Sequence, residues 1–83
     1  MTIKEIISSA GRSHHTIVIT ARERNGSKET REVEPYSYRF RKGHRLFYCY
    51  DISKRGTRSF VVSRIIAVAE TNNTFRPRWR IEV

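Results

Sequence analysis

Hydrophobic and polar side chains alternate with a period of two along several short stretches of the chain. Successive side chains of a strand point to opposite faces, so this pattern is typical of strands that bury one face in a core. Together with a β-branched stretch that begins at Thr16, it predicts five strands, at residues 16–22, 28–41, 45–50, 57–62 and 66–70. The chain is therefore expected to be mainly β.

The N-terminal residues have helical spacing instead. Ile3, Ile6 and Ile7 can share one face of a helix, which predicts a short amphipathic helix over residues 2–9. Gly11 is expected to end this helix, because glycine readily adopts the left-handed conformation of a helix terminus.

Turn residues separate the predicted strands. Asn25-Gly26 predicts a hairpin between the first two strands. Pro35 has no N–H for a ladder, so we expect a bend or bulge in the long second strand. Asn72-Asn73 is expected to end the fifth strand. Five short strands joined by tight turns favour a small, strongly bent barrel, because closure removes exposed sheet edges.

The alternation also predicts which face of the sheet is occupied by each side chain after Pro35 and in the third strand. One face of the second strand is expected to carry Tyr36, Tyr38 and Phe40, and the other Ser37, Arg39 and Arg41. The third strand is expected to place Leu46, Tyr48 and Tyr50 on one side and Phe47 and Cys49 on the other.

Charge narrows the choice of partners. The 83 residues suffice for one domain and carry 17 basic and eight acidic side chains, a net charge of +9. Residues 36–83 hold eleven of the basic and only three of the acidic groups, which favours a polyanionic partner such as nucleic acid, a nucleotide or an anionic membrane surface. Cys49 is the only cysteine, and no segment resembles a signal peptide or a membrane span. We therefore expect a soluble, cytoplasmic protein.

Candidate catalytic groups are few. His14, His15 and His44 do not have the spacing of metal ligands, and Cys49 lies in an apolar strand where a buried thiol is the usual interpretation. Glu32 and Glu34 share a strand face, but arginines nearby favour ion pairing over acid–base chemistry. We expect no enzyme activity, no metal site and no cofactor.

A binding role is better supported. Arg58 and Arg64 flank Phe60 and Val62 at strand spacing, and guanidinium groups suit phosphate oxygens. Tyrosines can provide stacking surfaces for unpaired bases. These residues also have interpretations without a ligand. The tyrosines would then be ordinary half-buried residues of the sheet, and the arginines would only protect strand edges from aggregation. The residues predicted to bind a ligand or nucleic acid are Arg31, Tyr38, Arg39, Tyr48, Tyr50, Arg58 and Arg64, with Arg31, Arg58 and Arg64 around a shared hollow.

The basic tail, residues 76–83, contains Trp79 and directly follows Phe75. Phe75 is expected to pin the C-terminal segment onto the sheet. For Trp79 two interpretations remain open, pinning the tail or forming part of an arm that lies on nucleic acid.

In the order of its motifs the chain resembles the WYL domain of bacterial transcription regulators over residues 2–75. The matching motifs are Arg31 to Pro35, the segment that ends in Tyr50-Asp51, Arg58 to Ile65, and Phe75. The run that names the family departs from the pattern, because Arg45, Leu46 and Phe47 stand where Trp, Tyr and Leu are expected.

The resemblance implies an Sm-like or SH3-like barrel that senses a ligand, either a nucleic acid strand or a nucleotide. It also implies an attached or associated helix-turn-helix domain, and it aligns Arg31, Arg58 and Arg64 with arginines of the family. The competing hypothesis is that the chain is a protein-interaction or dimerisation module without a nucleic-acid ligand. In that case its partner can be a second copy, which would give a homodimer.

Overall fold

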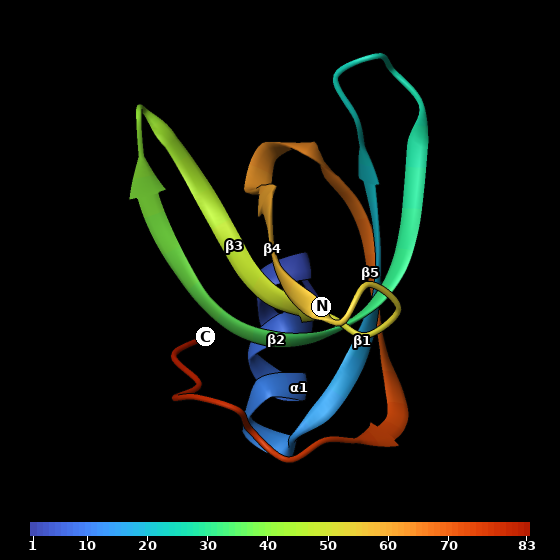
Figure 1. Ribbon diagram of the computed structural model, residues 1–83, viewed down its shortest axis with the longest axis vertical. Coiled ribbons are helices and arrows are strands. Elements are labelled where there is room, and N and C mark those ends of the chain that lie inside the picture. The colour runs from blue at the N-terminus through green and yellow to red at the C-terminus, as the bar shows by residue number, and fades with distance from the viewer.

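The computed structural model describes all 83 residues as one curved sheet with a single helix against it (Figure 1). In chain order the elements are α1 (Ile3–Ser13), β1 (His15–Arg22), β2 (Lys28–Arg41), β3 (His44–Asp51), β4 (Gly56–Val61), the 3-10 turn η1 (Val62–Arg64) and β5 (Ile65–Thr74). The predicted mainly β class and the short N-terminal helix are confirmed. No helix is long and apolar enough to cross a membrane.

The strands form one antiparallel sheet in the order β4-β3-β2-β1-β5. The N-terminal half of β2 pairs with β1 and its C-terminal half with β3, and the strand bends between the two halves (Figure 1). No ladder joins the edge strands β4 and β5, so the sheet is open and the expected barrel closure is not observed. The chain passes between these edges through η1, whose 3-10 conformation interrupts the extended backbone.

The bend in β2 is a β-bulge. Pro35 pairs with Cys49 and Ser37 with Tyr48, so Tyr36 is the extra residue on the bulged strand. The bulge expected at Pro35 is confirmed. It also corrects the predicted faces, because Tyr36 stacks on Trp79 while Tyr38 packs against Phe47.

The core lies between the concave face of the sheet and α1. Ile7 and Ala10 of α1 are fully buried against residues that include Ile17, Val33 and Phe47. The helix begins with a capping box in which the Thr2 hydroxyl accepts from the Glu5 N–H and the Glu5 carboxylate accepts from the Thr2 N–H. These hydrogen bonds lower the pKa of Glu5.

The expected end of the helix at Gly11 is wrong. The helix continues to Ser13 and is capped by His14, which has a left-handed φ of 57°. Gly11 has another role, because a Cβ at this position would collide with the side chain of Val83 and lie 3.2 Å from Ile81 Cγ2. The glycine therefore lets the C-terminal residues pack closely against the helix.

The expected end of β5 at Asn72-Asn73 is also wrong, because the strand continues to Thr74. A register shift between His15 and Ile17 accommodates this part of β5 beside β1. The Asn73 side chain donates to Glu32 over 2.8 Å, so tertiary contacts outweigh the turn preference of asparagine.

After β5 the tail runs below α1 and returns beside β2 (Figure 1). The Phe75 N–H donates to the His14 carbonyl over 2.9 Å, and the Phe75 ring contacts Tyr36 edge-on. Phe75 therefore pins the tail, as predicted. Farther along, the Glu82 N–H donates to the Tyr36 carbonyl, and the Glu82 carboxylate pairs with Arg39 at 2.8 Å.

Candidate functional site

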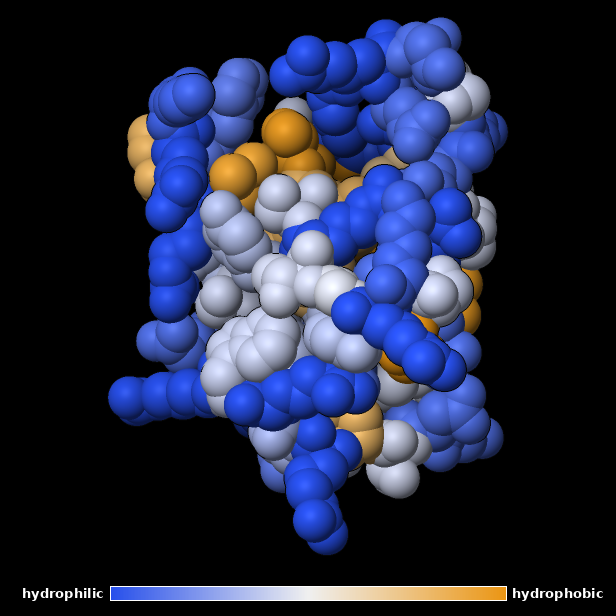
Figure 2. Space-filling view, in the orientation of Figure 1, coloured by the Kyte–Doolittle hydropathy of each residue, from blue (hydrophilic) through white to orange (hydrophobic).

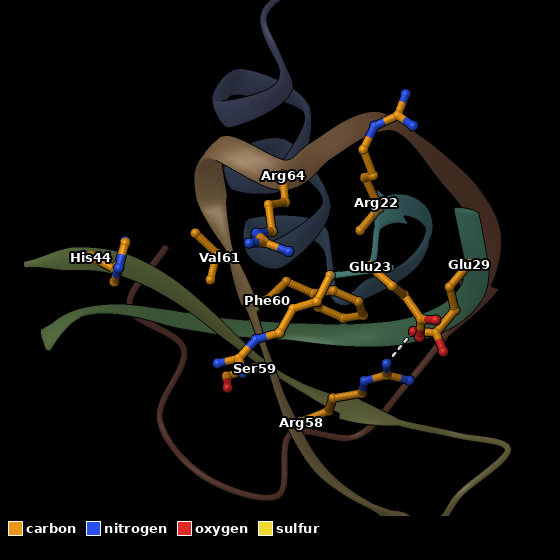
Figure 3. Close-up of a pocket in the computed structure, with 11 residues that line it drawn as sticks. Arg22, Glu23, Glu29, His44, Arg58, Ser59, Phe60, Val61 and Arg64 are labelled. Atoms are coloured by element: carbon orange, nitrogen blue, oxygen red, sulfur yellow. Dashed lines mark hydrogen bonds and ion pairs between the residues drawn. The ribbon is translucent and has the colours of Figure 1, made fainter. Parts of the chain in front are cut away.

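A basic hollow of about 400 Å³ lies between the β1–β2 hairpin and β4 (Figure 3). We call it the arginine hollow. Its apolar lining residues are Ala21, Phe60 and Val61, and its charged ones are Arg22, Glu23, Arg24, Glu29, Arg58 and Arg64. In Figure 2 an apolar floor is visible between strongly hydrophilic walls at this end of the molecule. Four arginines against two glutamates give the hollow a positive field.

The bend of the sheet creates this hollow, because it brings the hairpin opposite the edge strand β4. Arg58 and Phe60 are two residues apart on β4 and point to the same side, and the Arg58 guanidinium lies 4.8 Å from the centre of the Phe60 ring. Arg64 comes from η1 and projects above Phe60 (Figure 3).

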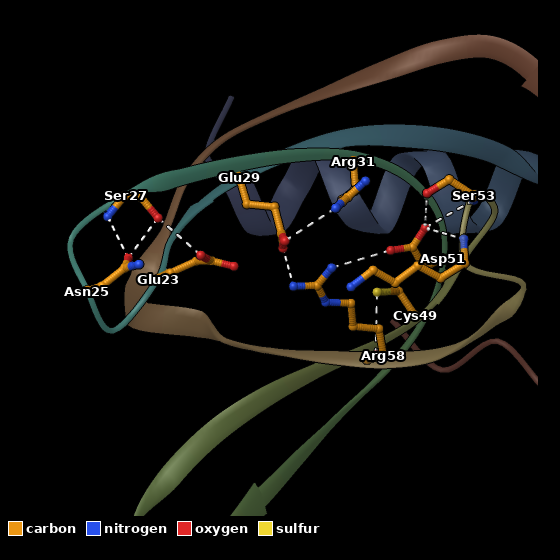
Figure 4. A network of polar contacts seen from close by, with 10 residues as sticks. Glu23, Asn25, Ser27, Glu29, Arg31, Cys49, Asp51, Ser53 and Arg58 are labelled. Atoms are coloured by element: carbon orange, nitrogen blue, oxygen red, sulfur yellow. Dashed lines mark hydrogen bonds and ion pairs between the residues drawn. The ribbon is translucent and has the colours of Figure 1, made fainter.

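Carboxylates hold Arg58 in place (Figure 4). Its guanidinium forms a close ion pair with Glu29 and lies 3.4 Å from Asp51 Oδ2. The other Asp51 oxygen accepts from the Ser53 N–H, the Ser53 hydroxyl and the Lys54 N–H. Burial acts to raise the pKa of Asp51, but the hydrogen bonds from Ser53, Lys54 and Arg58 together hold it below its ordinary value.

The three arginines expected around one hollow only partly gather there. Arg58 and Arg64 both line it, but Arg31 does not. Arg31 instead lies 3.6 Å from Glu29, and its Nε is buried without a hydrogen-bond partner. Arg64 forms no ion pair, so it contributes uncompensated charge to the hollow, whereas the charge of Arg58 is already balanced.

A second hollow, also of about 400 Å³, lies on the outer face of β2, β3 and β4. We call it the tryptophan hollow. It is lined by Ser37, Arg39, Arg41, Tyr48, Thr57 and Trp79. Two of the predicted binding residues, Arg39 and Tyr48, thus lie outside the arginine hollow and beside the tail.

The other predicted tyrosines lie elsewhere. The Arg78 guanidinium lies 3.8 Å from the centre of the Tyr50 ring and covers one face of it. Tyr38 packs against Phe47 near α1, and burial raises its pKa. The seven predicted residues therefore divide among separate surfaces rather than forming one tyrosine-lined patch.

Some residues that line the two hollows were not predicted. Arg22 and Arg24 come just before the Asn25-Gly26 turn. The sequence shows that they are near the hairpin tip, but it does not show what they face. Arg41 shares the alternation of Arg39, so the period of two was a usable signal. The position of Trp79 depends on how the tail folds back, which no local pattern encodes.

The side chains considered for catalysis are buried or are held in hydrogen bonds and ion pairs within the domain. Cys49 is fully buried, and burial raises the pKa of its thiol to about 12. Glu34 accepts from the Tyr36 hydroxyl over 2.7 Å and pairs with Arg78 at 3.2 Å. Glu32 accepts from the Thr16 hydroxyl and from Asn73, and these hydrogen bonds lower its pKa.

A strongly bent five-stranded sheet with a helix in its concavity and a basic hollow at one end defines a small β domain with an anion-attracting surface. The WYL domain model matches residues 2–70, and the chain belongs to this family. A search of curated proteins finds no significant match.

Among solved structures the chain is similar to the proteasome accessory factor B/C (PafBC) of Arthrobacter aurescens. The TM-score is 0.75 at 19% sequence identity, and the match covers 86% of this chain but only 11% of the other. The similarity supports the fold, and the chain corresponds to a small part of the larger protein.

Proposed function

We propose that this WYL domain is the ligand-sensing part of a transcription regulator, and that it binds single-stranded nucleic acid or a nucleotide by its phosphates in the arginine hollow. The observation that carries the proposal is that Arg58 and Arg64 line one hollow in which Arg64 has no acidic partner. The family resemblance adds the regulatory role and an attached or associated helix-turn-helix domain.

The two arginines would act differently on a phosphate. Arg64 offers free N–H donors from the end of η1, and its position beside β4 leaves them directed at the hollow. Arg58 is oriented by Glu29 and Asp51, so a phosphate that reaches it competes with Glu29. Arg22 and Arg24 add charge at the hairpin tip and strengthen the attraction at long range.

The test is binding of fluorescently labelled single-stranded DNA and RNA, measured by anisotropy over a salt series. Arg64→Ala should weaken binding by about tenfold, the scale of one hydrogen bond to a charged group. The matched control is Lys54→Ala, which removes one exposed positive charge outside the hollow. The slope of log affinity against log salt should become shallower by about 0.7 for each lost phosphate contact in Arg64→Ala. Equal affinities of the two variants would refute the proposal.

Two observations favour the competing role as a protein-interaction module. The sheet has two open edges, and Phe40 near the end of β2 is 74% exposed. Open edges and exposed aromatic groups favour association with another chain, including a second copy. Sedimentation over a range of concentrations tests this role, and it predicts that Phe40→Ser lowers the measured mass while leaving oligonucleotide affinity unchanged.

A further inference from the structure

The indole of Trp79 is held as a fixed, partly exposed aromatic surface. Its ring stacks on Tyr36 with 4.2 Å between centroids and 23° between planes, while 40% of the residue remains exposed. Hydrogen bonds on both sides restrain the tail, because the Arg78 N–H donates to the Tyr36 hydroxyl and the Glu82 N–H to the Tyr36 carbonyl. A surface that is already ordered loses little entropy when a ligand stacks on it.

The remaining lining of the tryptophan hollow suits a nucleotide. It contains two arginines and three hydroxyl groups but no carboxylate. Arg41 forms no ion pair. The side chains of the Arg39–Glu82 pair are 53% and 42% exposed, so solvent screens the pair and a phosphate can replace Glu82. An acidic peptide could use the arginines but would leave the flat indole without a matching partner, whereas every base has a π-face.

The tryptophan hollow adjoins the arginine hollow across two pairs of neighbouring residues. Ser59 lines the arginine hollow and is paired with Tyr48, which lines the tryptophan hollow. His44 and Arg41 form a second such pair. Directly opposed residues of antiparallel strands project to the same face, so Ser59 lies on the outer face with Tyr48, whereas Arg58 and Phe60 point to the other face of β4. Because β4 is an edge strand, one extended ligand can reach both hollows around its free edge.

We infer that the tryptophan hollow is a second subsite for single-stranded nucleic acid. One base stacks on Trp79, and Arg39 and Arg41 bind an adjacent phosphate. The inference rests on the proposed function of the arginine hollow and deepens it, because two adjoining subsites select an oligonucleotide over a mononucleotide. Figure 2 shows side chains of intermediate hydropathy in the middle of this face, with strongly hydrophilic side chains around them.

Trp79 is the only tryptophan, so its fluorescence reports directly on this subsite. The experiment titrates the whole chain with thymidine ligands from the mononucleotide to about eight nucleotides, within the range of small single-strand-binding barrels. We expect quenching of the fluorescence on binding, and affinity that rises with length until both hollows are filled. Quenching that is absent with every ligand, or affinity that does not depend on length, would overturn the second subsite.

Anisotropy with labelled oligonucleotides tests the residues. Trp79→Ala should weaken binding of the longest oligonucleotide by about tenfold, the scale of one base–aromatic stack. Because this change also loosens the tail, Arg41→Ala provides an independent variant in an exposed residue without partners. Its matched control is Lys42→Ala, which removes a neighbouring charge that does not line the hollow. Equal affinities of Arg41→Ala and Lys42→Ala would overturn the subsite.

The two proposals fail in distinguishable ways. If Arg64→Ala weakens binding but Arg41→Ala and Trp79→Ala do not, the arginine hollow binds the ligand without a second subsite. If Arg41→Ala and Trp79→Ala weaken binding but Arg64→Ala does not, the proposed function of the arginine hollow fails instead. An oligoglutamate that quenches Trp79 at the same concentrations as the oligonucleotide would overturn base stacking, because it would show that the surface responds to negative charge alone.

Discussion

Replacing Asp51 by asparagine tests the network that orients Arg58. The Asp51 side chain is 1% exposed, and its two oxygens have different partners. Oδ1 accepts from the Ser53 N–H at 3.1 Å, the Ser53 hydroxyl at 2.9 Å and the Lys54 N–H at 3.3 Å. Oδ2 faces Arg58 Nη1 at 3.4 Å. Asparagine can keep the first oxygen and its turn contacts, but it places an amide against the guanidinium.

The expected cost follows from the contact that is lost. A hydrogen bond between a buried group and a charged partner contributes about 1.5–3 kcal/mol, and the turn contacts of the other oxygen remain. Asp51→Asn should therefore lower the free energy of unfolding at neutral pH by about 1.5–3 kcal/mol. This is a large fraction of the total for a small domain, since single domains are stable by about 5–15 kcal/mol.

The pH dependence gives the sharper test. The pKa of Asp51 is lower in the folded state than its ordinary value of 3.8, so its carboxylate stabilises the fold fully above that value. This contribution is lost as the pH falls from 3.8 through the lower folded pKa, where wild-type Asp51 becomes neutral like asparagine. Urea unfolding followed by circular dichroism should show a difference between the two proteins that shrinks in this range.

Glu23→Gln controls for the loss of one negative charge at an exposed position. Glu32, whose pKa is also lowered, is present in both proteins, so its titration cancels in the difference. A stability difference that stays constant down to the acid transition would refute the reasoning, because the charge of Asp51 would then not be its source.

Two further predictions concern the neighbours of Arg58. Glu29→Gln removes the carboxylate shared by Arg58 and Arg31, so it should lower the free energy of unfolding by about 1–2 kcal/mol while oligonucleotides bind more tightly at low salt. Unchanged or weaker binding in the anisotropy assay would contradict this. Cys49 is buried and burial raises its thiol pKa to about 12, so a disulfide reagent at pH about 8 should label the native protein far more slowly than the urea-unfolded one. Similar labelling rates would show that the strand opens readily.

The features that the sequence predicts correctly depend on neighbouring residues. Asn25-Gly26 forms the turn between β1 and β2, and Gly26 has a φ of 88° that favours glycine. Pro35 marks the bulge of β2 because a missing N–H disturbs a ladder in any fold. Both signals act through the backbone of one or two residues, and no tertiary contact overrides them.

The features that the sequence misses depend on contacts between distant segments. Glu29 and Arg58 meet only because the sheet bends, and nothing in either strand indicates the pairing. Gly11 predicts a helix end by its local preference, but its role depends on Val83 at the other end of the chain. The expected gathering of arginines failed at Arg31 for the same reason, because Glu29 holds it beside the hollow rather than in it.

Arg45, Leu46 and Phe47 of β3 replace the Trp-Tyr-Leu run that names the family, and the structure shows what two of these differences change. Phe47 stands in place of leucine and is fully buried, so the core requirement of that position is retained. Leu46 stands in place of tyrosine and pairs with Arg39, so it lies on the outer face that carries the tryptophan hollow. The substitution removes a candidate stacking group from this face. Trp79, which follows the residues matched by the family model, places an aromatic ring on the same face. The position of this indole depends on Tyr36, the extra residue of the β2 bulge, so the same irregularity that bends the sheet also builds the second subsite.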